Sequence, residues 1–221
     1  MKRTFLTISA IIALGFSTHA QGGNMNLPTA YIRNTLSGNN NLPPNVVGSQ
    51  YVNEDFKKGQ VTIDGKSFET YVRYNAFKDE FEIREQSGDV TSLLRRENMI
   101  VKIGQDTYEI FSYTEDGKTQ KGYFKKLNSG ENILLLKEDV TLTAAQKATS
   151  TYSADKPASL DLDSQYFLKL NDNAAQEIRL KRKDILRAID SKKLEEYVSE
   201  NKFKLKKEHE VIQALNYINA S

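Results

Sequence analysis

The sequence of 221 residues contains no cysteine and no tryptophan, and only two histidines. Without cysteine, the chain has no disulfide, no thiolate metal ligand and no cysteine that could carry a lipid anchor. Zinc sites built from histidine and cysteine are therefore nearly excluded. A Ser-His-Asp triad would have to use His209, because the other histidine lies in the N-terminal leader, and no G-x-S-x-G motif precedes His209.

Other catalytic equipment is equally scarce. No glycine-rich phosphate loop joins a predicted strand to a predicted helix, so the chain has no recognisable nucleotide site. Asp161 and Asp163 could bind calcium through their carboxylates, but they are weak candidates because their run does not fit the EF-hand loop. The alternative is that they end a loop. Glu80 and Glu82 share the outward face of a predicted strand, where cross-strand charge pairing explains them. We therefore expect a protein that is not an enzyme and uses no cofactor.

Long hydrophobic runs are absent except at the N-terminus. Residues 1–20 begin with Lys2 and Arg3, continue through an apolar run and end with Thr18-His19-Ala20, which is the pattern of a signal peptide cleaved near Ala20-Gln21. The apolar run is shorter than a transmembrane helix. The sequence therefore predicts an exported, soluble protein of the periplasm or outer envelope that does not span the membrane.

The charge of the chain is nearly balanced, with 31 Lys and Arg against 29 Asp and Glu. Removal of the leader takes away Lys2 and Arg3 and leaves equal numbers, which argues against a nucleic-acid binder. Residues 179–207 differ, because 11 Lys and Arg face 5 Asp and Glu there, a local net charge of +6. This surface could dock an acidic envelope partner, or it could be an ordinary solvated helical face. The candidate contact residues are Lys192, Lys193, Lys206 and Lys207.

Composition and periodicity divide the chain into segments. After the leader, residues 21–50 are rich in Asn, Gly and Pro and read as an extended linker. Residues 51–180 show the period-2 alternation of antiparallel strands, with a polar loop near residues 144–159. Residues 181–221 change to helical periodicity and form a short helical tail, in which Asp190 or Ser191 supplies an N-cap.

The predicted fold class is α+β and mainly β: a curved antiparallel meander, or a half-open barrel or roll, with short C-terminal helices. Asp64-Gly65 and Asp116-Gly117 are typical of tight hairpin turns because they tolerate positive φ. The run Ile133-Leu134-Leu135-Leu136 is apolar on both faces of its strand. Such a sheet must be covered on both faces, by curling on itself or by the terminal helices. The last predicted hairpin joins residues 166–170 to residues 176–180.

Two stretches resemble an uncharacterised family of exported Bacteroidetes proteins. The first opens with G-S-Q-Y-V-N-E-D-F-K-K-G at residues 48–59, and the second is the helical end. The resemblance implies an envelope location and a β-meander with a helical tail, and it implies no activity. The segments that carry it are residues 48–59, 64–66, 72–75, 79–83, 193–198, 201–205 and 215–217.

The function expected from these observations is a non-catalytic binding or scaffold protein of the bacterial envelope, with a protein partner. A carrier of a lipid or other hydrophobic ligand in a curved sheet is the alternative, motivated by the strands that are apolar on both faces. A carboxylate- or calcium-dependent enzyme is a third interpretation, which would need Asp161 and Asp163, or the pair Glu80 and Glu82, in a concave pocket.

Overall fold

The computed structural model describes residues 27–34, 42–148 and 154–221. The predicted signal peptide, residues 1–20, lies outside the described residues. A short 3-10 helix, η1 (Thr29–Tyr31), precedes the first strand. The strands are β1 (Ile32–Asn34), β2 (Val47–Gly48), β3 (Lys57–Ile63), β4 (Lys66–Asn75), β5 (Glu80–Arg84), β6 (Val90–Leu93), β7 (Met99–Ile103), β8 (Asp106–Glu115), β9 (Lys118–Lys126), β10 (Asn132–Thr143), β11 (Ser159–Leu170) and β12 (Ala175–Glu177). The helices are α1 (Arg182–Ile189), α2 (Lys192–Glu200) and α3 (Glu208–Asn219).

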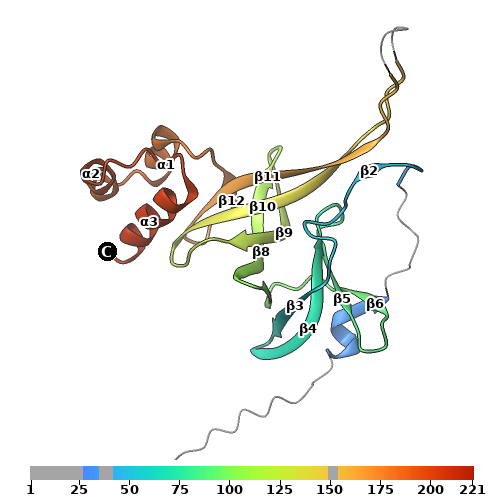
Figure 1. The fold of residues 1–221 in the computed structure, drawn as a ribbon. Coiled ribbons are helices and arrows are strands. Elements are labelled where there is room, and N and C mark those ends of the chain that lie inside the picture. Colours follow the sequence, from blue (N-terminus) through green and yellow to red (C-terminus); the bar gives the residue numbers. More distant parts are fainter. Residues whose placement is uncertain (1–26, 35–41, 149–153) are drawn as a thin grey trace, which may run out of the picture.

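The N-terminal half of the sheet follows the order β1-β6-β5-β4-β3-β7-β8 (Figure 1). Strands β3 to β6 form a meander, after which the chain returns to place β7 beside β3. The predicted alternation is confirmed on β4, where Phe68, Val72 and Tyr74 are buried. Two pieces of the predicted linker, residues 21–50, join the sheet, because β1 pairs with β6 and β2 pairs with β11.

The predicted hairpin turns form where the sequence places them. Asp64 and Gly65 have φ values of +49° and +75° between β3 and β4, and Asp116 and Gly117 have +48° and +72° between β8 and β9. Both positions of each turn therefore occupy the left-handed region that a type I′ hairpin requires.

A closed five-stranded barrel forms the second half of the sheet. Strands β8, β9, β10 and β11 are antiparallel neighbours, and the short β12 pairs with both β11 and β8. The β12–β8 pair is parallel and closes the ring. Aromatic rings fill its interior: Phe124 contacts Tyr113 and Phe167 edge-to-face, with ring centroids 5.1 Å apart in both pairs.

The run that is apolar on both faces, residues 133–136, lies in β10, and both of its faces are covered. Leu135 packs inside the barrel with Phe124 and Phe167, whereas Leu134 points outward into the core of the helices. Farther along the same strand, Val140 joins the core of the N-terminal half. The prediction of a doubly covered strand is confirmed, and both means of coverage, curling and helices, occur on the same strand.

The predicted polar loop near residues 144–159 lies between β10, which ends at Thr143, and β11, but β11 begins earlier than the periodicity suggested. Strand β11 starts at Ser159, not near Tyr166, and pairs with β10 along twelve positions from Thr143↔Ser159 to Asn132↔Leu170. The interpretation of Asp161 and Asp163 as a loop end is therefore wrong, since both lie within β11. Their alternation with Leu160 and Leu162 was present, but so many exposed polar residues obscured it.

The three helices pack together and against the outer face of the barrel (Figure 1). Ile185, Leu194, Val198 and Leu215 are fully buried and meet Leu134 and Leu168 of β10 and β11. Ser191 supplies the N-cap of α2, because its Oγ accepts a hydrogen bond from the Leu194 amide at 3.3 Å. The helices are short, so packing on the barrel must supply most of their stability.

Asparagine side chains fix the end of α3 to the turn between β9 and β10. Asn219 Oδ1 accepts hydrogen bonds from the backbone and side-chain nitrogens of Asn132, both at 2.9 Å. Its Nδ2 donates to the carbonyl oxygens of Ser129 and Asn132, also at 2.9 Å. Gly130, with φ of +121°, leaves the space that this side chain fills. We call this contact the asparagine latch.

Within the described ranges, no helix is long and apolar enough to cross a membrane.

Candidate functional site

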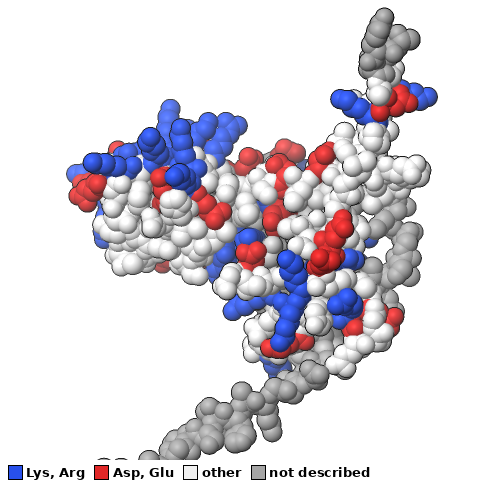
Figure 2. All heavy atoms as spheres, in the orientation of Figure 1, with Lys and Arg blue, Asp and Glu red and all other residues white. Residues whose placement is uncertain are grey.

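A basic hollow of about 660 Å³ lies on the helical tail, between the start of α1 and the connection from α2 to α3. Figure 2 shows Lys and Arg gathered along this part of the molecule. Five of the residues that line the hollow are cationic and none is acidic. The cations are Lys181, Arg182, Lys202, Lys204 and Lys206, and Ser199 and Phe203 complete the lining.

The alternating run from Lys202 to Lys206 presents its charges to this hollow. Leu205 is fully buried in the helical core and Phe203 is half-buried, so the three lysines between and beside them stay exposed. Lys202 and Leu205 adopt positive φ values of +56° and +51°, which bends the connection around the end of α2. The segment is therefore anchored by its apolar residues and offers its cations to solvent.

Arg182 ties the two sides of the basic hollow together. Its guanidinium donates to Ser199 Oγ at 2.6 Å and to the Phe203 carbonyl oxygen at 3.5 Å. The N-cap of α1, Lys181, makes no side-chain capping hydrogen bond. The first amides of α1 therefore add partial positive charge near the lysines. The arrangement suits an anionic group.

The four lysines predicted as partner contacts do not converge on one point. Lys206 lines the hollow, and Lys207 is the N-cap residue next to it. Lys192 and Lys193 begin α2, at the opposite end of a helix about 13 Å long, which is nine residues at 1.5 Å each. Lys192 lies 3.9 Å from Glu196, and Lys193 lies over the ring of Tyr217. Lys181, Lys202 and Lys204 also line the hollow and were not predicted, although the alternation of Lys with Phe203 and Leu205 signalled the last two.

The weak calcium candidates lie on the exposed arm of β11. Asp161 Oδ2 accepts hydrogen bonds from Thr143 Oγ1 and Ser159 Oγ, both at 2.9 Å. Asp163 Oδ1 accepts from the Ser164 amide at 2.8 Å. In the described part of the chain, no group of three or more His, Cys, Asp or Glu side chains is arranged to hold a metal ion. His209 is exposed in the first turn of α3.

The pair Glu80 and Glu82 does not form a carboxylate site. Glu80 pairs with Arg33, whereas Glu82 is buried and accepts from Arg73 Nε and Nη2 at 2.9 and 2.7 Å. The Arg73 guanidinium also lies 3.7 Å from the ring centre of Tyr51. Cross-strand charge pairing, expected for these carboxylates in general terms, is present between Arg73 and Glu82. Glu82 is buried, however, and does not lie on an outward face as predicted.

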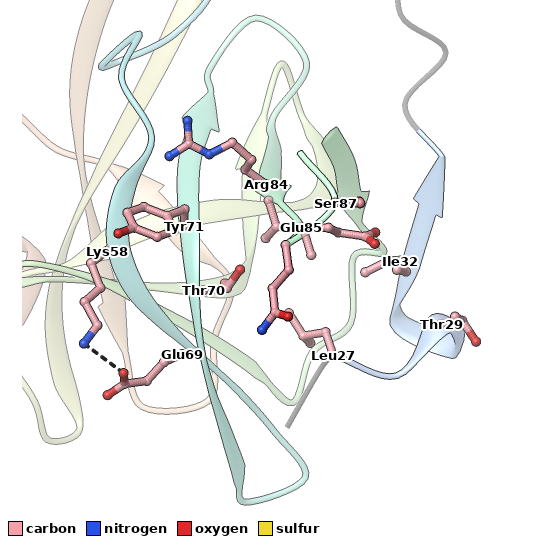
Figure 3. Close-up of a pocket in the computed structure, with 12 residues that line it drawn as sticks. Leu27, Thr29, Ile32, Lys58, Glu69, Thr70, Tyr71, Arg84, Glu85 and Ser87 are labelled. Atoms are coloured by element: carbon pink, nitrogen blue, oxygen red, sulfur yellow. Dashed lines mark ion pairs between the residues drawn. The ribbon is translucent and has the colours of Figure 1, made fainter. Parts of the chain in front are cut away.

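A larger pocket, which the sequence did not indicate, opens in the N-terminal half of the sheet. Its volume is about 810 Å³ (Figure 3). It forms because β5 pairs with β4 only from Tyr71 onward, so residues 66–70 of β4 separate from the β5–β6 hairpin. Leu27, Ile32 and Ile83 give it an apolar part, while the outer side chains of β3 and β4 and the turn after β5 give it polar walls.

The N-terminal wall of this pocket is held in place by several contacts. Strand β1 pairs with β6, and the Leu94 amide donates to the Tyr31 carbonyl oxygen at 2.9 Å. Tyr31 Oη donates to Asp64 Oδ2 at 3.1 Å, and the Arg96 guanidinium lies 5.0 Å from the Tyr31 ring centre. We call this cavity the β4–β5 pocket.

A polar cluster joins the loop after β4 to strand β9 of the barrel. Asp79 Oδ1 accepts from Tyr74 Oη at 2.6 Å and from the Tyr123 amide at 3.1 Å, and Asp79 also pairs with Arg95 at 2.9 Å. Burial, reinforced by the Asp79 charge, raises the pKa of the Tyr74 hydroxyl well above its ordinary value. Lys137 Nζ lies over the rings of Tyr113 and Phe124. All of these groups are engaged in internal contacts, so the cluster serves the fold.

Comparisons with known proteins add no functional assignment. No family model, no curated protein and no solved structure matches the chain. Functional inference therefore rests on the geometry of the basic hollow and of the β4–β5 pocket.

Proposed function

We propose that this protein is a non-catalytic binding or scaffold protein of the bacterial cell envelope. The sheet and barrel act as its platform, and the helical tail docks it onto an acidic protein surface. The observation that carries the proposal is the basic hollow, where five cations meet without a carboxylate among the lining residues. Like charges gathered in one place repel one another, and an anionic partner would relieve this repulsion.

The distribution of ion pairs supports this role for the tail. Arg182 donates to neutral groups, and two ion pairs within the tail are long: Arg187–Asp184 at 3.5 Å and Lys192–Glu196 at 3.9 Å. Exposed pairs of this kind contribute little to stability. The positive charge of the tail therefore remains available to steer an acidic partner, and its effect should weaken as salt increases.

The envelope location rests on the predicted signal peptide and on the family resemblance. The alternative role as a lipid carrier would need space inside the curved sheet. The barrel interior instead holds Phe124 and Phe167, which are 1% and 2% exposed, in contact with Tyr113. This observation favours docking over carriage.

Capture of partners from a bacterial envelope extract tests the docking role. The protein and a triple variant, Lys181→Glu with Lys202→Glu and Lys206→Glu, are immobilised in parallel. The matched control is Lys66→Glu with Lys118→Glu and Lys156→Glu, which changes three exposed lysines of the β region by the same charge. A second variant, Lys192→Glu with Lys193→Glu, asks whether the far end of α2 takes part.

The expected result is an acidic protein that the parent and the control retain and the hollow variant loses by about tenfold or more, a change of about 1.4 kcal/mol in binding. Its release should begin at moderate salt because the contact is electrostatic. Identical partners on all variants, or a partner retained equally at high salt, would contradict the docking role of the tail.

A further inference from the structure

We propose that the β4–β5 pocket binds a neutral saccharide. The juxtaposition that carries this inference is a half-exposed tyrosine ring beside a ring of hydrogen-bonding side chains with balanced charge, in a cavity of about 810 Å³. Cavities of roughly 300–1,000 Å³ are the usual size for small-molecule sites. The pocket lies in the β region, so this inference does not depend on the docking role of the helical tail.

The polar walls of the pocket offer donors and acceptors together. Lys58 and Arg84 can only donate, whereas Glu69 and Glu85 accept, and the hydroxyls of Thr29 and Thr70 do both. A ligand rich in hydroxyl groups meets such a mixed set well, because every hydroxyl both donates and accepts. A purely apolar ligand would leave these groups without water or partner, at a cost for each of them.

The charges in the pocket cancel. Lys58 Nζ lies 2.9 Å from Glu69 Oε2, and the remaining pair of opposite charges is Arg84 and Glu85. A strongly anionic or cationic ligand therefore has no excess of countercharge to meet, in contrast to the basic hollow of the tail. This balance favours a neutral ligand over a phosphate, an acidic peptide or a polyamine.

Tyr71 supplies the flat apolar surface that a sugar ring needs. It is 49% exposed, which makes it one of the three large apolar side chains most exposed in the described chain. The Arg84 guanidinium lies 5.0 Å from the Tyr71 ring centre and also lies 5.3 Å from that of Phe56, so it holds the ring from one side. The C–H face of a pyranose can pack against such a ring, whose negative face attracts the slightly positive hydrogens.

The turn at residues 85–89 is ordered before any ligand arrives. The Glu85 amide donates to the Asp89 carbonyl oxygen at 2.9 Å, and the Gly88 amide donates to the Glu85 carbonyl oxygen at 3.0 Å. Ser87 Oγ donates to Asp89 Oδ2 at 2.9 Å. A turn that is already ordered loses little conformational entropy on binding, whereas a flexible loop would lose more.

Saturation-transfer NMR and calorimetry on the purified protein test the proposal. The probes are the neutral trisaccharides cellotriose, maltotriose, mannotriose and N-acetylated chitotriose, with trigalacturonic acid and trialanine for comparison. At least one neutral sugar should bind with a Kd of about 1 mM or tighter, with saturation transferred to its ring C–H protons. The acidic sugar and the peptide should bind more weakly than that sugar.

Variants place the sugar in the pocket. Tyr71→Ala should weaken binding about tenfold, whereas Tyr71→Phe should bind within about twofold because the ring remains. Leu162→Ala is the matched control, since Leu162 is 50% exposed on β11, outside the residues that line the pocket. Gln86→Ala, in the exposed turn, should weaken binding about threefold through a lost hydrogen bond without affecting the fold.

Three results would overturn the proposal. They are the absence of saturation transfer to every neutral sugar, tighter binding of trialanine or trigalacturonic acid than of all of them, and unchanged affinity in both Tyr71→Ala and Gln86→Ala. Circular dichroism verifies that each variant is folded before its affinity is compared.

Discussion

The β region and the helical tail use charge in opposite ways. In the β region, basic side chains form close internal contacts: Arg73 with Glu82 at 2.7 Å, Lys125 with Asp106 at 2.7 Å and Arg95 with Asp79 at 2.9 Å. In the tail, the pairs Arg187–Asp184 and Lys192–Glu196 are longer and more exposed. Similar residue types therefore hold one region together and leave the other electrostatically unsatisfied.

This difference distinguishes charges that stabilise the fold from charges that the fold does not need. The tail is stabilised by its apolar core, including Leu205 and Leu215, which are fully buried, so its lysines are not needed for folding. The buried pair Arg73 and Glu82, by contrast, cannot be separated without leaving a charge in the protein interior. The following experiments break or sharpen the comparison, beginning with the largest effect.

Loss of Glu82 should be the most destabilising change. Glu82→Ala leaves the guanidinium of Arg73 beneath Tyr51 without its carboxylate, and breaking a buried pair costs about 3–5 kcal/mol. The tail counterpart, Asp184→Ala, should cost at most about 1 kcal/mol because its partner Arg187 is exposed. Chemical denaturation measures both. Equal losses for the two variants would remove the distinction between the regions.

The second-largest effect is expected at alkaline pH, which should lower the stability of the β region. Burial raises the pKa of Tyr74 and Tyr108, and it raises that of Tyr113 to about 12. In the unfolded chain these hydroxyls ionise near their ordinary pKa of about 10. Since the raised folded pKa keeps them protonated, their contribution to stability is complete below about pH 10 and is lost as pH rises through the folded values.

Titration of the absorbance of tyrosinate, alongside circular dichroism, measures this effect. We expect part of the tyrosine signal to appear only with the loss of structure above about pH 10. Full ionisation of every tyrosine in a protein that keeps its fold would contradict the burial of these hydroxyls.

A smaller loss of stability is expected from Gly130→Ala, which changes the contact between the helical tail and the barrel. An added Cβ would lie 2.4 Å from Asn219 Nδ2 and would disturb the asparagine latch, in addition to the strain of φ at +121°. The expected loss is about 2–4 kcal/mol, the sum of a left-handed backbone penalty and overpacking.

Gly117→Ala is the matched control for the latch, since Gly117 has φ of +72° and an added Cβ meets nothing within 4 Å. Its loss should be about 1–2 kcal/mol, the backbone penalty alone. Thermal unfolding measures the total loss of stability in each variant. Hydrogen exchange in α3 then shows how much of it comes from the asparagine latch and how much from the backbone penalty. Equal losses would show that the latch adds nothing to the attachment of the tail.

The smallest effect on stability is expected from the basic hollow itself. The triple variant at Lys181, Lys202 and Lys206 should change the free energy of unfolding by about 0.5 kcal/mol or less for each substitution, because all three side chains are exposed. Denaturant titration measures it. A large destabilisation would mean that the lysines hold the tail together and would weaken their interpretation as docking residues.

Much of the fold could be predicted from local patterns. Positive-φ dipeptides such as Asp64-Gly65 fixed the hairpins, and the doubly apolar run around Leu134 predicted coverage on two sides. The closure of the barrel could not be predicted, because β12 is three residues long and pairs in parallel with a distant strand. Period-2 alternation carries information about faces but none about which strand lies beside which.

The sites were only partly predictable for a related reason. An excess of Lys and Arg in residues 179–207 identified the tail, but which lysines share a hollow depends on how α1 meets the α2–α3 connection. The β4–β5 pocket gave no sequence signal, since it arises from the place where β4 and β5 stop pairing, beyond Tyr71↔Arg84. Pairing ends are set by tertiary packing, which single residues do not encode.

The parallel contact between β12 and β8 has a consequence for the order in which the molecule assembles. Gln176 Nε2 donates to Thr114 Oγ1 at 2.8 Å across 62 positions of the chain. Closing so long a loop costs chain entropy before any contact repays it, so the ring should close late and slowly. Until then Tyr113, Phe124 and Phe167 should be exposed to water, and an exposed aromatic surface of this kind promotes aggregation. Pairing of the three residues of β12 with β8 and β11 is therefore the step that we expect to end this exposure.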